Sequence, residues 1–342
     1  ILFIYPFFNK SSESPSATDK TDDKRKSTWN WVPKGPVENS PLFEWPVSIT
    51  KIAFWFKTNY FSMSIRIFVI LMALITWWFA TPSLESSKEF AISWMAWIYC
   101  RNLILIFLVA GGLHLFLYTF RGQGDKLKFD HRWMAEGSKL FSFKNQVFDN
   151  MYWTLVYAVS FWTGFEIIFL WGYANDFLLQ ITWDSNPIWF VALLLIIPIW
   201  HSMHFYWTHR ALHYKPLYDR VHSVHHRNIS IGPWSGLSMH PVESFIYLTS
   251  IVLHLFIASS PFHLIFHLQF LVFNAVIAHS GFEGIALKDK KIVDVGRFHH
   301  QLHHKFFECN YGNAEMPWDR WFGTFNDGSD GAMKGIRKNR IL

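Results

Sequence analysis

Long apolar runs separated by polar segments dominate this chain. Four of them are each about as long as the roughly 20 residues that one helical membrane crossing needs: 61–80, 102–120, 152–172 and 187–207. Residues 242–280 hold two shorter runs, broken at Ser259-Ser260-Pro261. A helical hairpin fits this last stretch, either as two thin crossings or as a re-entrant pair. The pattern therefore predicts an all-α fold, a polytopic membrane bundle of about four to six spans.

The N-terminal part of the chain has a different pattern. Residues 9–28 are rich in Ser, Thr, Asp and Lys, which is typical of a solvated segment that does not fold alone. We therefore divide the chain into a polar arm with an amphipathic lead-in, residues 1–60, and a membrane domain, residues 61–342. An arm of this kind that is held in place needs a surface to hold it, so we expect a protein partner for it.

The cations sharpen the topology. Six crossings would place all but three of the 31 Lys and Arg residues on one side of the membrane, the exceptions being Arg66, Lys88 and Arg101. Such an excess marks the cytoplasmic side, or the matrix side in a mitochondrion. We expect an integral protein of the endoplasmic reticulum or mitochondrial inner membrane in a eukaryote, and of the inner membrane in a bacterium.

Composition supports this class and excludes others. Charged residues make up 16% of the chain, below the roughly 25% of a soluble domain, and aromatic residues make up 19%. The net charge of +6 does not indicate nucleic-acid binding, because the cations lie in loops between apolar runs. Two cysteines are too few for a disulfide framework or a thiolate zinc site.

Eight histidines in the C-terminal half form three closely spaced groups. Their spacings are H-x-x-x-H in residues 209–213 and H-x-x-H-H in both 222–226 and 300–304. Residues three and four apart share one face of a helix, so each group is expected to direct its rings at one point. One divalent ion takes about four to six ligands, so eight neutral imidazoles predict two ions. The predicted ligands are His209, His213, His222, His225, His226, His300, His303 and His304.

The topology brings these groups together. The first two groups follow the fourth span, and the hairpin returns the chain to the same side before the third group. We therefore expect one helical, histidine-rich cap on the cytoplasmic or matrix side. His279, at the end of the hairpin, is either a ninth ligand or an interfacial histidine. The alternatives are a histidine-rich helix that only solvates the membrane edge and a single structural zinc, which would leave several imidazoles unexplained.

Other polar residues are candidates for supporting roles. Metal-binding histidines need partners for their second nitrogens, and nearby carboxylates can supply them. Glu283 can ligate or orient, since it would lie one helical turn after His279, and His240 can support a ligand from behind or cap a helix. Inside the spans, His201 and His204 are expected to line a cavity, and Glu166 to be a neutral, hydrogen-bonded acid. The candidate carboxylates are Asp219, Glu243, Glu283, Glu308 and Asp319.

These motifs, in this order, resemble the fatty acid hydroxylase / sterol desaturase superfamily of membrane di-iron enzymes. The resemblance covers roughly residues 187–327 and is specific for the superfamily but not for a substrate. It rests on Tyr206 to His213, the H-x-x-H-H of 222–226, His240-Pro241-Val242-Glu243, His279-Ser280-Gly281-Phe282-Glu283, His299 to His304, Asn310-Tyr311-Gly312 and Trp318 to Phe325.

The resemblance implies a chemistry that spacing alone does not. The two metals would be iron, with zinc as a substitute on purification, and molecular oxygen would be the oxidant. A C–H bond of a lipid (sterol, fatty acyl or related) would be hydroxylated or desaturated. Electrons would come from a separate haem or iron–sulfur protein, because the chain has no G-x-G-x-x-G fingerprint.

The resemblance also implies a site. It would consist of the nine histidines with no further catalytic residue, supported by His240, Glu243, Glu283, Asn310 and Asp319. Some hydroxylases of the superfamily have another histidine where this chain has Glu283, which leaves a tenth ligand open.

Two other classes of function compete with a lipid oxygenase. A hydroxylase-like accessory subunit of a larger membrane complex would have a structural role, but a retired site usually loses imidazoles that are costly to bury. A zinc-dependent membrane hydrolase would require an H-E-x-x-H helix, which the sequence lacks.

Overall fold

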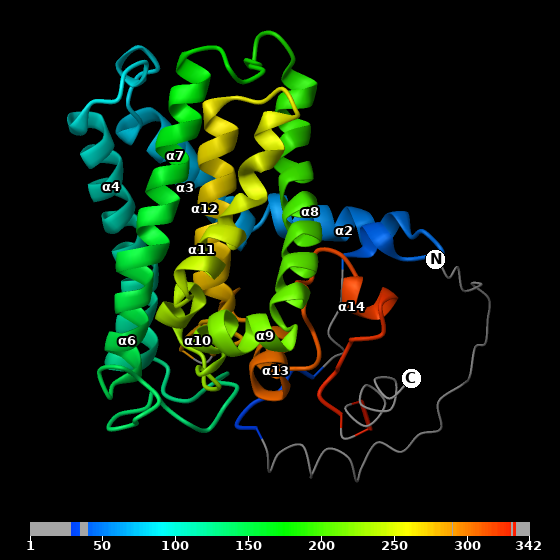
Figure 1. The fold of residues 1–342 in the computed structure, drawn as a ribbon. Coiled ribbons are helices and arrows are strands. Elements are labelled where there is room, and N and C mark those ends of the chain that lie inside the picture. The colour runs from blue at the N-terminus through cyan, green and yellow to red at the C-terminus, as the bar shows by residue number, and fades with distance from the viewer. Residues whose placement is uncertain (1–28, 35–39, 289, 330, 333–342) are drawn as a thin grey trace.

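The computed structural model describes residues 29–34, 40–288, 290–329 and 331–332. Figure 1 shows a bundle of long helices with a mostly helical cap at one end. The predicted polar arm, residues 9–28, and its expected partner lie outside the described residues.

Four helices of the described chain are long and apolar enough to cross a membrane. A fifth candidate is α2 (Ile49–Tyr60) with α3 (Ile65–Ala80), a pair bent by 42°. This agrees with the predicted polytopic bundle of about four to six spans. The four are α4–η3–α5–η4 (Ile92–Ile106, Phe107–Gly111, Gly112–His114, Leu115–Thr119), α6–η5–α7 (Gln146–Tyr152, Trp153–Ala158, Val159–Ala174), α8 (Pro187–Leu212) and α12 (Pro261–Ala278).

The predicted hairpin is present and extends to the far end of the bundle. It consists of α11 (Pro241–Leu248), η8 (Thr249–Leu255) and α12, with the break before Pro261. Ser260 caps α12 by accepting a hydrogen bond from the His263 backbone N–H, so the polar break also starts the next helix. Ser259 at the tip exchanges backbone hydrogen bonds of 3.0 and 3.1 Å with residues 179 and 181 of the loop between α7 and α8. The hairpin therefore reaches the end opposite the cap (Figure 1).

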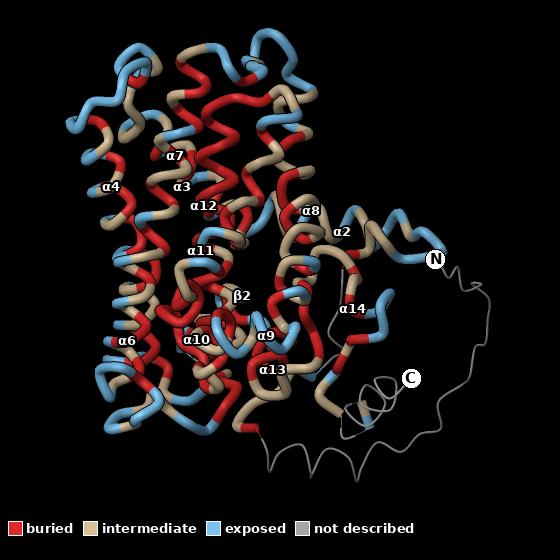
Figure 2. The backbone as a smooth tube through the Cα atoms, in the orientation of Figure 1, coloured by how far each residue is buried: buried red, intermediate tan, exposed pale blue. Residues whose placement is uncertain are grey.

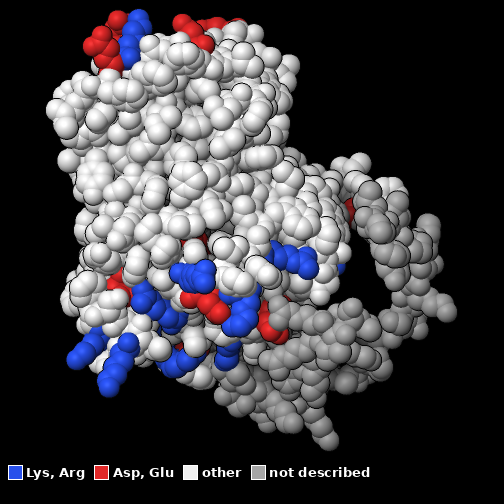
Figure 3. All heavy atoms as spheres, in the orientation of Figure 1, with Lys and Arg blue, Asp and Glu red and all other residues white. Residues whose placement is uncertain are grey.

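Helix α12 forms the centre of the bundle. Nearly all of its side chains are buried, and it packs against α3, α7 and α8 (Figure 2). The surrounding helices expose large apolar side chains on their outer faces, among them Trp78, Leu108 and Ile188. Charged residues gather at the two ends in Figure 3, and the wall between them is uncharged. This distribution is typical of helices that face lipid.

One ion pair inside the bundle corrects two predictions. Arg101, expected in a loop, lies in α4 with its side chain only 6% exposed. Its guanidinium is 2.5 Å from the carboxylate of Glu166 on α7. Glu166 is therefore hydrogen-bonded to a neighbouring helix, as we expected, but its partner is a cation and not a neutral group. A charge inside an apolar bundle is stable only with such a partner.

The cap contains short elements between the long helices. They are η1 (Pro41–Phe43), α9 (Lys215–Leu217), η6 (Tyr218–His222), α10 (Ser223–His226), η7 (Pro233–Leu237), α13 (Phe298–Phe306) and α14 (Trp318–Trp321), while η2 (Glu85–Ser87) lies in a loop at the other end. The only strands of the described chain, β1 (Gly284–Leu287) and β2 (Lys290–Asp294), form an antiparallel hairpin that the all-α prediction missed. Residues 29–31 also join the cap, where Trp29 packs edge-on against Phe298 with ring centroids 5.1 Å apart.

Candidate metal centre

Nine buried or half-buried histidines of the cap form two groups that could each hold a metal ion. Within each group, the ring nitrogens lie within 4.8 Å of one another. The first histidine group is His209, His213, His222, His226 and His303, and the second is His225, His279, His300 and His304. The structure thus brings together all eight histidines of the spaced motifs and His279.

Four chain segments supply these rings. Helix α8 ends at Leu212, so His209 lies in its last turn and His213 directly after it. His279 directly follows α12, and the remaining histidines lie on η6–α10 and α13. Since α8 and α12 both run to the cap, the crossings of the bundle fix the spacing of the site.

The two H-x-x-H-H motifs do not each serve one point, as we expected from their spacing. In the motif of α13, His300 and His304 belong to the second group, whereas His303 belongs to the first. The motif at 222–226 splits in the same way, with only its middle histidine in the second group. Residues four apart align on one helix face, and the residue between them turns away from that line. Each motif therefore bridges the two groups.

The distances between ring nitrogens match the edges of a coordination shell. In the second group, the Nε2 atom of His279 is 2.9 Å from that of His300 and 3.0 Å from that of His304. In the first group, the Nε2 atoms of His303 and His226 are 3.0 Å apart. Nitrogens bound to one metal at about 2.0–2.1 Å are themselves about 2.9–3.4 Å apart. A neutral imidazole has one N–H, so proton sharing cannot satisfy several such contacts at once.

Burial keeps these histidines in the form that binds metal. Desolvation, with a smaller contribution from neighbouring histidines, holds their pKa well below the ordinary value of 6.5, and metal ligation needs neutral imidazole. This holds for His222, His225, His226, His300, His303 and His304.

The second nitrogen of several rings meets a fixed acceptor. The Nδ1–H groups of His209 and His303 each donate over 2.6 Å to a backbone carbonyl, of Tyr311 and Cys309 respectively. His222 donates over 2.8 Å to Glu243. His279 donates over 2.7 Å to the carbonyl of Ala275, one turn earlier on α12. Such acceptors leave Nε2 as the ligand atom and fix the ring plane.

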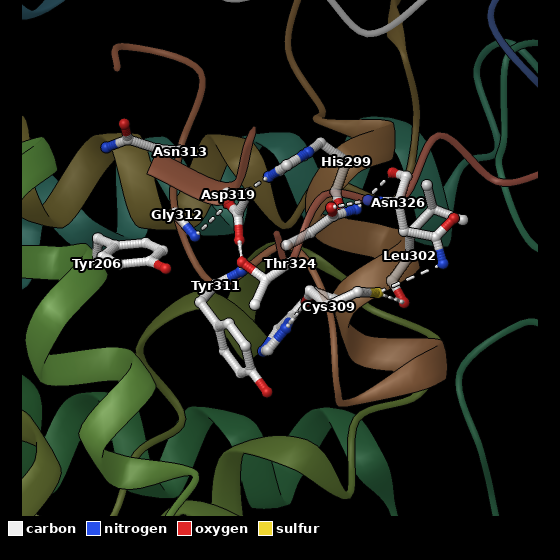
Figure 4. Close-up of polar contacts among 12 residues, drawn as sticks. Tyr206, His299, Leu302, Cys309, Tyr311, Gly312, Asn313, Asp319, Thr324 and Asn326 are labelled. Carbon is white, nitrogen blue, oxygen red and sulfur yellow. Dashed lines mark hydrogen bonds and ion pairs between the residues drawn. The ribbon is translucent and has the colours of Figure 1, made fainter. Parts of the chain in front are cut away.

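Asp319 holds the loop that supplies one of these carbonyls. Its carboxylate accepts hydrogen bonds of 2.8 Å from the backbone N–H groups of Tyr311 and Gly312, and of 2.7 Å from the Thr324 hydroxyl. His299 Nε2 lies 3.3 Å away (Figure 4). Burial opposes ionisation, but these partners outweigh it and lower the pKa of Asp319. Gly312 packs so closely that a Cβ there would be 3.0 Å from the carboxylate.

Asn310 holds the adjoining turn. It adopts φ 55°, a left-handed conformation that Asn tolerates better than most residues. Its side-chain amide donates over 3.1 Å to the carbonyl of His299 and over 2.9 Å to that of Asn326, and its Oδ1 accepts from the Asn326 N–H at 2.7 Å. The preceding carbonyl, that of Cys309, is thereby fixed toward His303.

Two expected supporting residues, Glu283 and Asp219, lie elsewhere, and His240 has the capping role that was one of its two predicted roles. Helix α12 ends at Ala278, and the chain then turns through Gly281 at φ 77°, so Glu283 is not one helical turn beyond His279. Its carboxylate belongs to neither histidine group and lies 3.9 Å from Lys291 Nζ. Asp219 pairs at 2.7 Å with Lys215 on the surface. His240 is outside both groups and caps α11 by accepting from Val242, which orients the helix that carries Glu243.

Two functional features escaped sequence reasoning. The first is the pair of backbone carbonyls of Tyr311 and Cys309. Every residue has such a carbonyl, so the residue types do not predict which ones accept a hydrogen bond from a histidine. His299 lies beside His300 in sequence and yet turns to Asp319, a pairing that only the fold decides. Their signal in the sequence was indirect, in the run Asn310-Tyr311-Gly312.

A cavity opens against both histidine groups. His209 and His222 of the first group line it, as do His225, His279 and His300 of the second. Its other walls are largely apolar and include Phe205, Leu212, Met239, Ile246 and Tyr247. His201 lines it as we expected, whereas His204 does not and instead meets the Thr249 hydroxyl at 3.1 Å. Apolar walls beside a cluster of imidazoles would place an apolar group next to the two histidine groups.

Comparison with known proteins finds a family that resembles part of this chain. Residues 192–324 match the family model described as fatty acid hydroxylase, close to the 187–327 of the resemblance. Over these residues the chain is similar to the fatty acid hydroxylase / sterol desaturase superfamily, and this match supports the resemblance that its motifs carry.

Its curated relatives act on sterols by name. The chain is 31% identical to human lathosterol oxidase over 140 residues, 39% of this chain and 45% of the relative. It is 29% identical to a Delta(7)-sterol 5(6)-desaturase of Gibberella zeae over 144 residues, 40% and 42% of the two chains. With a Delta(7)-sterol 5(6)-desaturase of Schizosaccharomyces pombe it shares 28% identity over 249 residues, 70% of this chain and 78% of the relative. The chain thus spans less than half of the first two relatives. No solved structure matches it.

Proposed function

We propose that the chain is a membrane-bound oxidoreductase that uses two iron ions and molecular oxygen to hydroxylate or desaturate a C–H bond of a lipid. The observation that carries this proposal is the pair of buried histidine groups facing one largely apolar cavity. Similarity to the superfamily supports it.

The donor set fits iron. All nine candidate ligands are imidazoles, which suit iron as well as zinc, copper and nickel, so zinc can replace iron on purification. The first group offers five nitrogens and the second four, enough for one ion each. When bound, iron would catalyse the oxidation of the C–H bond, and molecular oxygen would be the oxidant.

The protein's own residues would hold, orient and shield this centre. Backbone carbonyls and Glu243 fix the rings from behind, with Asp319 and Asn310 holding the loop between them. His240 would orient Glu243 indirectly, because it caps α11, the helix that carries Glu243. Glu283 contributes to neither group in this arrangement, so we propose nine ligands and not ten. The apolar cavity wall would exclude water and receive the lipid.

The relatives' names favour a sterol or a related lipid as the substrate. Because the cavity lies where the bundle meets the cap, a lipid can approach from the bilayer. We propose that the cap faces the cytoplasm or the matrix, since Lys and Arg gather there (Figure 3). The expected membranes are the endoplasmic reticulum or mitochondrial inner membrane of a eukaryote, or the inner membrane of a bacterium.

Electrons would come from a separate haem or iron–sulfur protein. The sequence has no dinucleotide fingerprint, and the basic cap would attract an acidic partner. A role as an accessory subunit would be supported by a partner of residues 9–28, which lie outside the described chain.

The test is metal analysis with an oxygen-dependent assay on the full chain in lipid nanodiscs. We expect about two iron ions per chain, and a hydroxylated or desaturated product of an added sterol or fatty acyl lipid when a reductase system and oxygen are present. Lipid analysis of a knockout would name the natural substrate. A chain that binds two metals and gives no product with any of these lipids would support the accessory role.

A further inference from the structure

A second hollow lies where the bundle meets the cap. It adjoins the cavity that opens against the two histidine groups, which we call the metal cavity. The second hollow lies between α2, the start of α3 and residues 314–321, and its lining includes Phe43, Trp55, Asn59, Arg66 and Trp321. We call it the interfacial groove. Arg297, Ala314 and Glu315 line both the groove and the metal cavity, so the two hollows meet at these residues.

The groove lies at the depth expected for lipid head groups. Helix α2 projects sideways from the bundle above α14 in Figure 1. Its residues Ile49 and Phe54 and the following Phe61 are 81%, 66% and 82% exposed, although all three are large and apolar. A helix of this kind lies in the interface plane with its apolar face toward the acyl chains. Aromatic and cationic side chains around the groove are typical of the same depth.

One cation of the groove has no ion-pair partner within the described part of the chain. The lining includes the cations Lys51, Arg66 and Arg297 and the anions Glu44 and Glu315. Both anions are engaged, Glu44 with Lys51 at 2.9 Å and Glu315 with Arg66. No ion pair or side-chain hydrogen bond involves Arg297 among the described residues. A guanidinium binds carboxylate or phosphate oxygens with two parallel hydrogen bonds.

The Arg66–Glu315 pair lies at the border between the groove and the metal cavity. Its side chains are 8% and 15% exposed, and Glu315 lines both hollows. The Arg66 guanidinium also lies 5.0 Å from the Trp55 ring and 5.2 Å from the Tyr60 ring. A buried ion pair adds little stability compared with apolar side chains of the same size, so stability does not explain this one. Because of this position, the ion pair is a polar contact on the border between the two hollows.

We propose that the interfacial groove binds the anionic head group, a carboxylate or a phosphate, of the lipid whose apolar chain enters the metal cavity. Arg297 binds the head, and the Arg66–Glu315 pair is the border contact that the chain passes. This assignment rests on the proposed function for the reaction that follows, but head-group binding can be measured without turnover. Among the lipids of that proposal, it selects an anionic acyl lipid over the sterol that the relatives' names suggest, because the head of a sterol is a neutral hydroxyl.

The test uses the full chain in nanodiscs and two photoreactive probes. Both are 16-carbon chains with a diazirine near the head, one a carboxylic acid and the other the corresponding alcohol. We expect the acid to label residues 40–66 and 312–321, and Arg297→Gln to lower this labelling by about fivefold or more. Arg297→Lys should recover part of it, because the charge remains without the planar fork. Lys290→Gln, which removes an exposed cation of β2 outside the groove, should leave it unchanged.

A second variant keeps the test decisive if Arg297→Gln does not fold. Glu315→Gln removes an anion from the groove and releases Arg66, so labelling by the acid should rise by about twofold or more. Labelling that neither variant alters, or that falls only on the lipid-facing helices, would overturn the proposal. Equal labelling by the alcohol would overturn the anionic preference.

Failure of the groove and failure of the reaction are distinguishable. Iron content and product formation test the oxidation, and they need no result from the probes. If labelling depends on Arg297 but the chain forms no product, the proposal for the groove stands and the proposal of lipid oxidation is wrong.

Discussion

Two regions of this protein bury histidines, and they bury them differently. In the cap, the Nε2 atoms of several rings face one another at about the separation of atoms bound to one ion. In the bundle, His254, His263 and His267 are 0% exposed, and each ring nitrogen has a partner of its own. The comparison shows that neither burial nor number makes a metal site. A set of nitrogens without other partners, directed at one point, can hold a metal ion.

Two of these three histidines, His254 and His267, form a hydrogen-bonded row, and His263 has partners of its own. His254 lies 2.8 Å from the Ser259 hydroxyl through Nδ1 and 3.1 Å from His267 through Nε2. His267 continues to the Ser250 hydroxyl at 3.0 Å. His263 is 2.7 Å from the Ser260 hydroxyl and 2.9 Å from the carbonyl of Phe190. These contacts satisfy every ring nitrogen, so no ligand atom is left for an ion.

The largest contrast should come from removing one ring in each region. His303→Ala should remove one metal equivalent and lower product formation by more than about 100-fold, because it deletes a ligand and a contact to His226. His267→Ala should retain both metals. Metal content by plasma mass spectrometry checks both variants, and loss of metal in His267→Ala would break the comparison.

A smaller effect should follow from loosening a ring without removing it. Asp319→Ala deletes the clamp on the loop whose carbonyl holds His209, so metal affinity should fall by about 10–100-fold. Competition with a chelator measures the affinity, and the thermal midpoint of the metal-free protein shows whether the fold is intact. Asp184→Ala, an exposed residue in the loop before α8, is the matched control. Equal affinity in both variants would contradict a positioning role for Asp319.

In the bundle, the expected effect is on stability alone. His267→Ala leaves His254 and Ser250 each short of a buried partner, which should lower the free energy of unfolding by about 1–3 kcal/mol. Chemical unfolding in detergent measures this, with the exposed His131→Ala as the control. An unchanged free energy of unfolding would mean that the row contributes nothing to the bundle.

The smallest effect concerns pH. Burial lowers the pKa of the cap histidines outside the spans well below 6.5, so they remain neutral as the pH falls past 6.5. Metal affinity should change by less than about threefold between pH 7.5 and 6.5 and fall only when the pH passes the lowered values. Several ordinary histidines would lose more than about tenfold over the same range. A steep loss above pH 6.5 would show that the cap rings are solvated.

The sequence predicted which histidines lie together, because histidine spacing is local. The long runs predicted the crossings, and the break at Ser259-Ser260-Pro261 predicted the hairpin. The eight spaced histidines and His279 all lie in the two groups. Prediction failed where partners are distant in sequence. Glu283 was placed by extending α12 beyond its end at Ala278, and Arg101 was placed in a loop because its partner, Glu166, lies 65 residues away.

By itself, the sequence determined that this is a helical membrane protein with enough imidazoles for two metals. Hydrophobic run length and helical spacing are properties of short segments, and they survive without knowledge of the fold. Only the tertiary structure decided which histidines share an ion and which backbone carbonyls fix their rings. The tertiary structure also decided that the interfacial groove and the metal cavity share lining residues. These contacts depend on the distances between segments that are far apart in the sequence and that only folding brings together.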